Sequence, residues 1–146
     1  MTRKTGNRAQ QAGAESLAAV RAKNKTAWLD LFAEDAVIQD PVGVSPLDPS
    51  GLGHRGKDAI GRFWDAVIAP GQLETKIRES YPAGDECANG ATFVNHLPNG
   101  HKIETDLVVV YRVDACGRIA SLKAYWEYAK IAAQLEKLLA GADRKG

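Results

Sequence analysis

Hydrophobic side chains recur at helical spacing in three parts of the chain. Between Glu15 and Phe32 the apolar positions follow a helical period that Asn24 interrupts, which predicts two short helices with a bend between them. The same spacing returns from Lys57 to Ala69, where Pro70-Gly71 ends it. A third stretch, Lys130 to Leu139, carries an apolar stripe and predicts a final helix.

The remaining hydrophobic segments alternate with polar residues or are short and β-branched, as is typical of strands. The predicted strands are Ala36–Gln39, Leu73–Tyr81, Ala88–Leu97, His101–Val113 and a run around Leu122–Trp126. Turn residues separate them, most clearly Pro98-Asn99-Gly100, which predicts a hairpin. In the longest strand the positions expected to share the inner face are Ile103, Thr105, Leu107, Val109 and Tyr111.

Helices followed by hairpin-connected strands predict an α+β fold, in which helices pack on the concave face of a curved antiparallel sheet. Such an arrangement encloses a cone-shaped apolar pocket. The segment from Val42 to Gly56 is rich in Gly, Pro, Ser and Asp and is predicted to be a surface loop. We expect one domain over residues 14–140, a disordered N-terminal tail over 1–13 and a C-terminal tail over 141–146.

Composition narrows the classes of function. The chain has 146 residues and a formal net charge of +1, so it lacks the field that would hold nucleic acid or an anionic membrane. No apolar run is long enough to span a bilayer, and the N-terminus lacks a signal-peptide core, so we expect a cytoplasmic protein. Cys87 and Cys116 are expected to be reduced thiols, and no spacing of His, Cys, Asp and Glu suggests a metal site.

Asp40 is the strongest candidate for chemistry. The following Pro41 cannot donate to a strand ladder, which places Asp40 at the end of a strand. An Asp-Pro pair at a strand end is also a common turn, so the residue has a purely structural interpretation. We favour a carboxylate in the pocket, acting as a general base or as a hydrogen-bond acceptor for a ligand.

Three segments resemble the ketosteroid isomerases and the wider SnoaL-like group, which share the nuclear-transport-factor-two-like cone fold. They are Leu31 to Gly43, Arg55 to Trp64, and Val113 to Ile119 with the following Ala124-Tyr125-Trp126. The first resembles the isomerases themselves, whose general base is an Asp followed by Pro, an apolar residue and Gly. The other two recur across the whole group and carry the fold.

The resemblance implies roles for particular residues. Asp40 matches the base that removes a proton beside a ketone and returns it two carbons further along, without a cofactor. The Asp that hydrogen-bonds the enolate in the family falls on Val109, and the Tyr with the same task falls near Ser16. Since an aliphatic side chain cannot donate, His96, Tyr111 and Ser16 are the substitute donor candidates, and His96 is expected to face inward.

The remaining candidates belong to the pocket wall. Phe63, Leu107, Val109 and Trp126 are expected to bind the ligand, and Phe63 and Trp126 suit a flat polycyclic molecule, although core packing alone also explains such aromatics. His54 and His101 are expected to be solvated.

Two functions follow as hypotheses. The first is a cofactor-independent isomerase of the steroid type that acts on a hydrophobic ketone through Asp40. The alternative is a protein of the same fold that binds a steroid or polyketide-like ligand without reacting it, and other reactions of the fold group, such as dehydration, aldol cyclisation or epoxide hydrolysis, rank third.

A homodimer is expected, because Val108, Val110 and Tyr125 leave an apolar patch on the outer face of the sheet.

Overall fold

The computed structural model describes residues 6–97 and 100–145, with side chains described up to residue 138. Its elements follow one another as α1 (Arg8–Arg21), α2 (Lys25–Asp30), β1 (Phe32–Gln39), β2 (His54–Arg55), α3 (Gly56–Phe63), a π-helical turn (Trp64–Ile68), β3 (Gln72–Ala83), β4 (Glu86–His96), β5 (Lys102–Val113), β6 (Ile119–Tyr125) and α4 (Tyr128–Lys145). Pro98 and Asn99 of the predicted hairpin turn lie outside the described residues.

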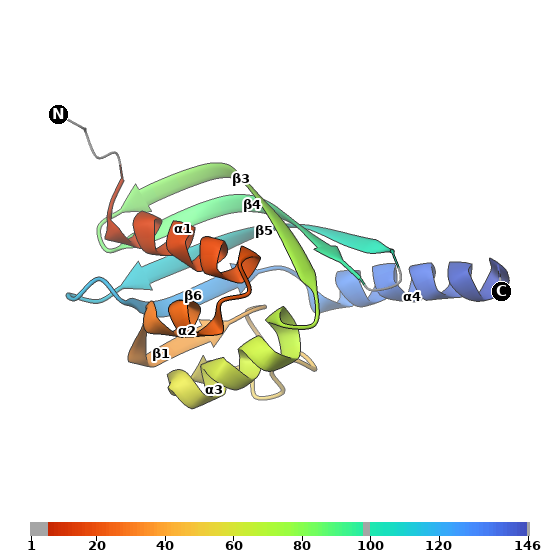
Figure 1. Cartoon of the computed structure of the whole chain (residues 1–146), viewed down its shortest axis with the longest axis horizontal. Helices are drawn as coiled ribbons and strands as arrows, with labels where there is room; N and C mark the ends of the chain where they lie inside the picture. Colours follow the sequence, from red (N-terminus) through yellow and green to blue (C-terminus); the bar gives the residue numbers. More distant parts are fainter. Residues whose placement is uncertain (1–5, 98–99, 146) are drawn as a thin grey trace.

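The six strands form one curved sheet in the order β2-β1-β6-β5-β4-β3 (Figure 1). All neighbouring pairs are antiparallel except β1 and β6, which run parallel. Helices α1, α2 and α3 lie together on one side of the sheet, whereas α4 projects away from it. The predicted α+β cone is therefore confirmed, with one parallel pair in a sheet that was expected to be antiparallel.

The first helix begins earlier than its hydrophobic pattern indicates. Its cap is Asn7, whose side chain accepts a hydrogen bond from the backbone of Gln10 at 2.9 Å and donates to the carbonyl of Glu86 at 2.8 Å. Ala9 and Ala12 are buried beneath it. Residues 8–13 are thus helical instead of belonging to the predicted tail, because a cap and small buried alanines, which leave only a weak hydrophobic signal, define this turn.

The last helix is also longer than its apolar stripe. It runs from Tyr128 to Lys145 and so takes in the predicted C-terminal tail up to residue 145. Ile131, near its start, packs toward the sheet, and Gln134 donates to the carbonyl of Glu104 at 3.3 Å. In the described part of the chain no helix has the length and apolar character needed to cross a membrane.

The core lies between α1, α2 and the concave face of the sheet. Trp28 is 2% exposed, and its ring lies 4.7 Å from that of Phe32 and 5.1 Å from that of Trp64. Gly13 faces the ring of Tyr111 so closely that a Cβ there would lie 2.8 Å from a ring carbon. Glycine at this point lets the backbone of α1 approach β5.

Lys23 connects the end of α1 to the turn before β3 through hydrogen bonds. It has a left-handed backbone with φ of 56°, and its ammonium donates to the carbonyls of Ile68 at 2.8 Å, Ala69 at 3.0 Å and Gly71. These carbonyls belong to the turn between the π-helical segment and β3, so one cation satisfies acceptors that the helix end leaves free.

We expect Lys23→Met to lower the free energy of unfolding by about 2 kcal/mol, since hydrogen bonds to a charged donor would be lost from a partly buried turn. Urea denaturation followed by circular dichroism measures the change. Lys25→Met is the matched control, because Lys25 pairs with the exposed Asp65 at 2.9 Å and such surface pairs contribute only about 0–1 kcal/mol. Equal losses in the two variants would contradict the bracing role of Lys23.

Candidate active site

Asp40 and Trp126 meet because of the parallel pairing of β1 and β6. Gln39 lies opposite Lys123 in this pair, so both strands end at the same edge of the sheet. Asp40 directly follows β1, and Trp126 directly follows β6. The indole Nε1 donates to the Asp40 carboxylate at 2.6 Å, so the structure brings these two residues together.

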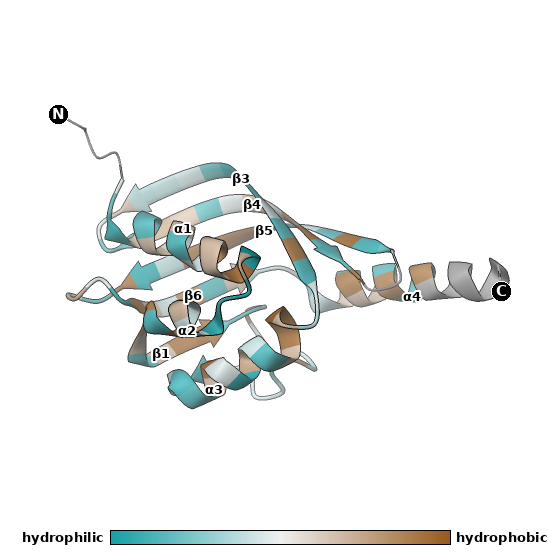
Figure 2. Ribbon diagram, in the orientation of Figure 1, coloured by the Kyte–Doolittle hydropathy of each residue, from teal (hydrophilic) through white to brown (hydrophobic). Residues whose placement is uncertain are grey.

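The carboxylate opens into an apolar cavity of about 180 Å³. Its wall combines the inner face of the sheet with the π-helical segment, whose hydrophobic end lies beside the start of β3 (Figure 2). The lining residues are Asp40, Leu47, Val67, Ile68, Leu73, Phe93, Asn95, Ile103, Thr105, Leu107, Trp126 and Ile131. An apolar chamber with few polar groups is the usual form of a small-molecule site.

The cavity adjoins an open groove of about 570 Å³ between α4 and the sheet. Thr105, Trp126 and Ile131 line both spaces. The cavity alone is smaller than the roughly 300–1,000 Å³ of most ligand pockets. A polycyclic molecule would therefore fill the cavity with one end and extend past Thr105 into the groove with the other.

Burial raises the pKa of the Asp40 carboxyl above its ordinary value. The indole N–H of Trp126 and the nearby His54 favour the charged form and partly offset this effect. A carboxylate whose proton affinity is increased is a stronger base than one in water, and its position in the cavity gives it access to a bound molecule.

His54 lies near Asp40, outside the cavity lining, although the sequence suggested a solvated loop residue. It stands in β2 opposite Ile38, and its ring lies 5.0 Å from that of Phe63. Its Nε2 is buried and has no hydrogen-bond partner within the described residues. The short strand β2 turns the ring inward, and this strand lies in a segment whose composition indicates only turns.

The segment from Val42 to Gly56 is more than a surface loop. Asp48 is 6% exposed and accepts hydrogen bonds from the Ser50 hydroxyl at 2.9 Å and the Gly53 N–H at 2.8 Å. Burial alone would raise the pKa of Asp48, but these bonds outweigh it and the pKa is lowered. The ordered loop places Leu47 in the cavity wall.

Ser16 and Tyr111 come together, but away from the cavity lining. Both are 2% exposed; their side chains hydrogen-bond to each other, and Trp28 Nε1 donates to the Ser16 hydroxyl at 3.1 Å. Burial and the charge of Asp40 raise the pKa of Tyr111, so its hydroxyl stays protonated at neutral pH. Neither side chain lines the cavity.

Some of the other predicted site residues line the cavity and others do not. Leu107 and Trp126 line the cavity, whereas Phe63 and Val109 are buried in the core around it. His96 is exposed on the outer face of β4, 3.6 Å from Glu74, and its inward orientation was therefore predicted wrongly. The neighbouring Asn95 is the one that faces inward, since side chains alternate along a strand.

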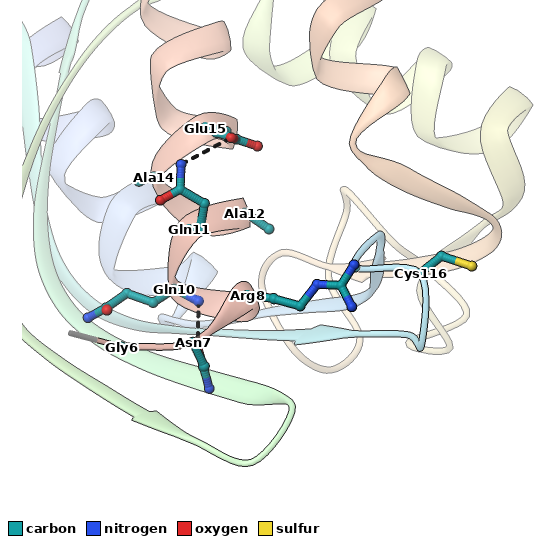
Figure 3. A pocket seen from close by; sticks show the side chains of 10 residues that line it. Gly6, Asn7, Arg8, Gln10, Gln11, Ala12, Ala14, Glu15 and Cys116 are labelled. Carbon is teal, nitrogen blue, oxygen red and sulfur yellow. Dashed lines mark hydrogen bonds between the residues drawn. The ribbon is translucent and has the colours of Figure 1, made fainter. Parts of the chain in front are cut away.

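A larger hollow of about 590 Å³ lies elsewhere, between the start of α1 and the β5–β6 turn (Figure 3). Its polar side chains already have structural partners. Arg8 extends toward the turn that carries Cys116 and donates to the carbonyl of Ala115 at 3.1 Å, and Gln11 donates to Glu15 at 3.1 Å. Volume alone therefore does not identify the site, and the carboxylate in the apolar chamber is the better candidate.

Among the described residues no group of three His, Cys, Asp or Glu side chains is arranged to hold a metal ion. Cys87 is buried and Cys116 is exposed, and both are free thiols.

Comparison with solved structures finds close relatives of the whole domain. RV0760c from Mycobacterium tuberculosis is 34% identical, with a TM-score of 0.82 over 87% of this chain and 96% of the relative. The same protein in complex with estradiol-17β-hemisuccinate is 35% identical, with a TM-score of 0.79 over 84% and 95%. The Δ5-3-ketosteroid isomerase from Mycobacterium sp. is 33% identical, with a TM-score of 0.78 over 82% and 93%.

The SnoaL-like domain model matches residues 14–122, which include β1, Asp40 and most of the sheet. The fold, the family match and the similarity to the isomerase agree with one another. The chain therefore belongs to the SnoaL-like family and has its cone-shaped fold.

Proposed function

We propose that this protein is a cofactor-independent isomerase that moves a double bond of a steroid-like ketone. The observation that supports it best is Asp40, a carboxylate of raised pKa that opens into an apolar chamber and is oriented by Trp126. One ring of the substrate would occupy the chamber. Asp40 would remove a proton from the carbon beside the carbonyl and return it two carbons further along, so that the double bond moves into conjugation with the ketone. The similarity to a ketosteroid isomerase supports the same reaction.

The test is an absorbance assay with a 5-ene-3-ketosteroid, in which conjugation of the product gives the signal. We expect turnover by the purified protein at neutral pH. Absence of turnover, when the same preparation binds the steroid, would contradict the enzymatic proposal.

A second candidate is a steroid-binding protein without catalysis. It is favoured by the positions of Ser16, Val109 and Tyr111: Val109 has no donor, and the other two lie outside the cavity lining. Donors at the developing oxyanion usually supply a large part of the rate, about 10²–10³-fold each. Tight binding of a phenolic steroid without turnover of the ketone would establish this alternative.

We further propose that the protein is a homodimer that pairs through the outer face of the sheet. Val108 is 43% exposed, and its register partner Tyr125 is 46% exposed on the neighbouring strand. Val110, on the same face of β5, continues this apolar patch. An apolar patch of this kind favours association.

Val108→Asp is expected to convert a dimer into a monomer, because it places an unpaired charge in the apolar interface. Sedimentation at micromolar concentration measures the mass of both proteins. Val44→Asp is the matched control, since Val44 is 77% exposed in the loop that follows β1 and does not belong to a strand of the sheet. A monomeric wild-type protein, or a dimer that survives Val108→Asp, would contradict the proposed interface.

A further inference from the structure

Besides Asp40 and Trp126, two polar side chains lie in the cavity wall. Asn95 on β4 and Thr105 on β5 both line the chamber, and within the described residues neither side chain makes a hydrogen bond. Two other polar side chains of β4 do have partners: Thr92 donates to Asp106 at 2.6 Å, and Asn89 accepts from Cys87 at 3.4 Å. A half-buried polar group in an apolar wall lacks a partner that a ligand is able to supply.

The sheet register places this pair at a distance from Asp40 along the sheet. Ala124 on β6 lies opposite Val109 on β5. Trp126, two residues after Ala124, therefore lies at the level of Leu107. Thr105 is one inward position further along β5, about 7 Å from Leu107. Ile103 is the next inward-facing residue of β5 after Thr105 in the direction away from Leu107. Asn95 lies opposite Ile103 on β4.

The two side chains are close enough to act together. Thr105 lies opposite Phe93, which makes Asn95 its diagonal neighbour on the adjacent strand. Such neighbours are about 7–8 Å apart, within reach of one oxygen placed between their side chains. The Asn95 amide is also held in place, because it packs against Gly71, where a Cβ would lie 2.4 Å from its oxygen.

We infer that Asn95 and Thr105 form a second polar subsite, which binds a hydroxyl or carbonyl group at the end of the ligand remote from Asp40. This inference rests on the proposed function, in which the cavity holds a steroid-like molecule. An amide and a hydroxyl each donate and accept, so the pair serves a ketone as well as an alcohol.

The charged side chains near this subsite favour a neutral group on the ligand. The adjoining groove carries three acidic side chains, Glu104, Asp106 and Glu127, and one basic side chain, Lys130. An anionic group at this end would be repelled, whereas a neutral hydroxyl would exchange bound water for two protein contacts.

The test compares estradiol with its analogue that lacks the 17-hydroxyl. Their phenol would lie toward Asp40, and their remote ends differ only by the group assigned to the subsite. A neutral hydrogen bond corresponds to about 5-fold in affinity, so equilibrium dialysis should show that the wild-type protein prefers estradiol by about 5–30-fold. In Thr105→Val and Asn95→Leu this preference should fall toward unity, while affinity for the deoxy analogue stays the same.

Two controls complete the comparison. Thr105→Ser keeps the hydroxyl and should restore most of the preference, and Thr92→Val changes an outward-facing threonine of β4 and should leave it intact. A preference that persists in both cavity variants, or that is absent in the wild type, overturns the subsite while steroid binding stands. If neither steroid binds the wild-type protein, the proposed function and the subsite both fail.

Discussion

Replacing Asp40 with asparagine is expected to reduce the rate of double-bond migration in a 5-ene-3-ketosteroid by about 10²–10⁴-fold, the usual contribution of a positioned general base. Asparagine has nearly the same shape as aspartate and still accepts a hydrogen bond from Trp126, which reaches this side chain at 2.6 Å. Its amide cannot take up a proton. The variant therefore removes the base and leaves the cavity wall in place.

The assay needs a control that changes charge without touching the site. Asp35→Asn is suitable, because Asp35 lies on the same strand, β1, and is exposed to solvent. Its rate should stay within about twofold of the wild-type rate, as expected for a surface substitution. An Asp40→Asn protein that keeps full activity would show that another group abstracts the proton.

Binding separates the two proposed functions in the same variant. A neutral steroid should bind Asp40→Asn about as well as the wild-type protein, because the apolar walls are unchanged. In an enzyme the substitution then lowers turnover without a matching loss of affinity, the pattern expected when an interaction acts only in the transition state. In a binding protein neither quantity differs from the wild type.

The alternation of polar and apolar residues along the strands was enough to predict much of the fold. Alternation along β5 placed Leu107 and Thr105 on the inner face, and Pro41 placed Asp40 at a strand end; the structure agrees with each. Trp126 was expected to bind the ligand, and its hydrogen bond to Asp40 follows from the parallel pairing of β1 and β6. Such a pairing between strands far apart in sequence leaves no local signal.

The errors have a common physical cause, since they concern details that tertiary contacts decide. His96 was assigned to the inner face of β4, but the register of the β4–β5 pair points Asn95 inward. Because side chains alternate, an error of one residue moves a whole strand's side chains to the opposite face. His54 and Leu47 were missed because the loop that carries them folds around the buried Asp48, an arrangement that turn-rich composition does not reveal.

The stability of the protein is expected to fall as pH rises through the range in which Asp40 ionises. Burial raises the pKa of this carboxyl in the folded state above the ordinary value of 3.8, so the folded protein holds the proton more tightly than the unfolded chain. The resulting stabilisation is complete below the unfolded pKa and is lost as pH rises to the folded pKa. Each unit between the two values corresponds to about 1.4 kcal/mol.

Asp48 acts in the opposite direction, because its pKa is lowered and its stabilisation is lost as pH falls through its folded pKa. The difference between wild type and Asp40→Asn isolates Asp40 from this and every other group. Denaturant unfolding at a series of pH values should show the variant gaining stability relative to the wild type as pH rises, until Asp40 is fully ionised.

Trp126→Phe provides the complementary test. It removes the indole donor that favours the charged form, so the pKa of Asp40 should rise further and its loss of stability should extend to higher pH. Carboxyl NMR of the wild type, Trp126→Phe and the Asp35→Asn control measures the titration directly, and the order of the midpoints is the decisive result. An Asp40 that titrates at or below the value of a model peptide would mean that hydrogen bonds, nearby charge or access of water outweigh its burial. The proposed base would then lack the increased proton affinity on which its reactivity depends.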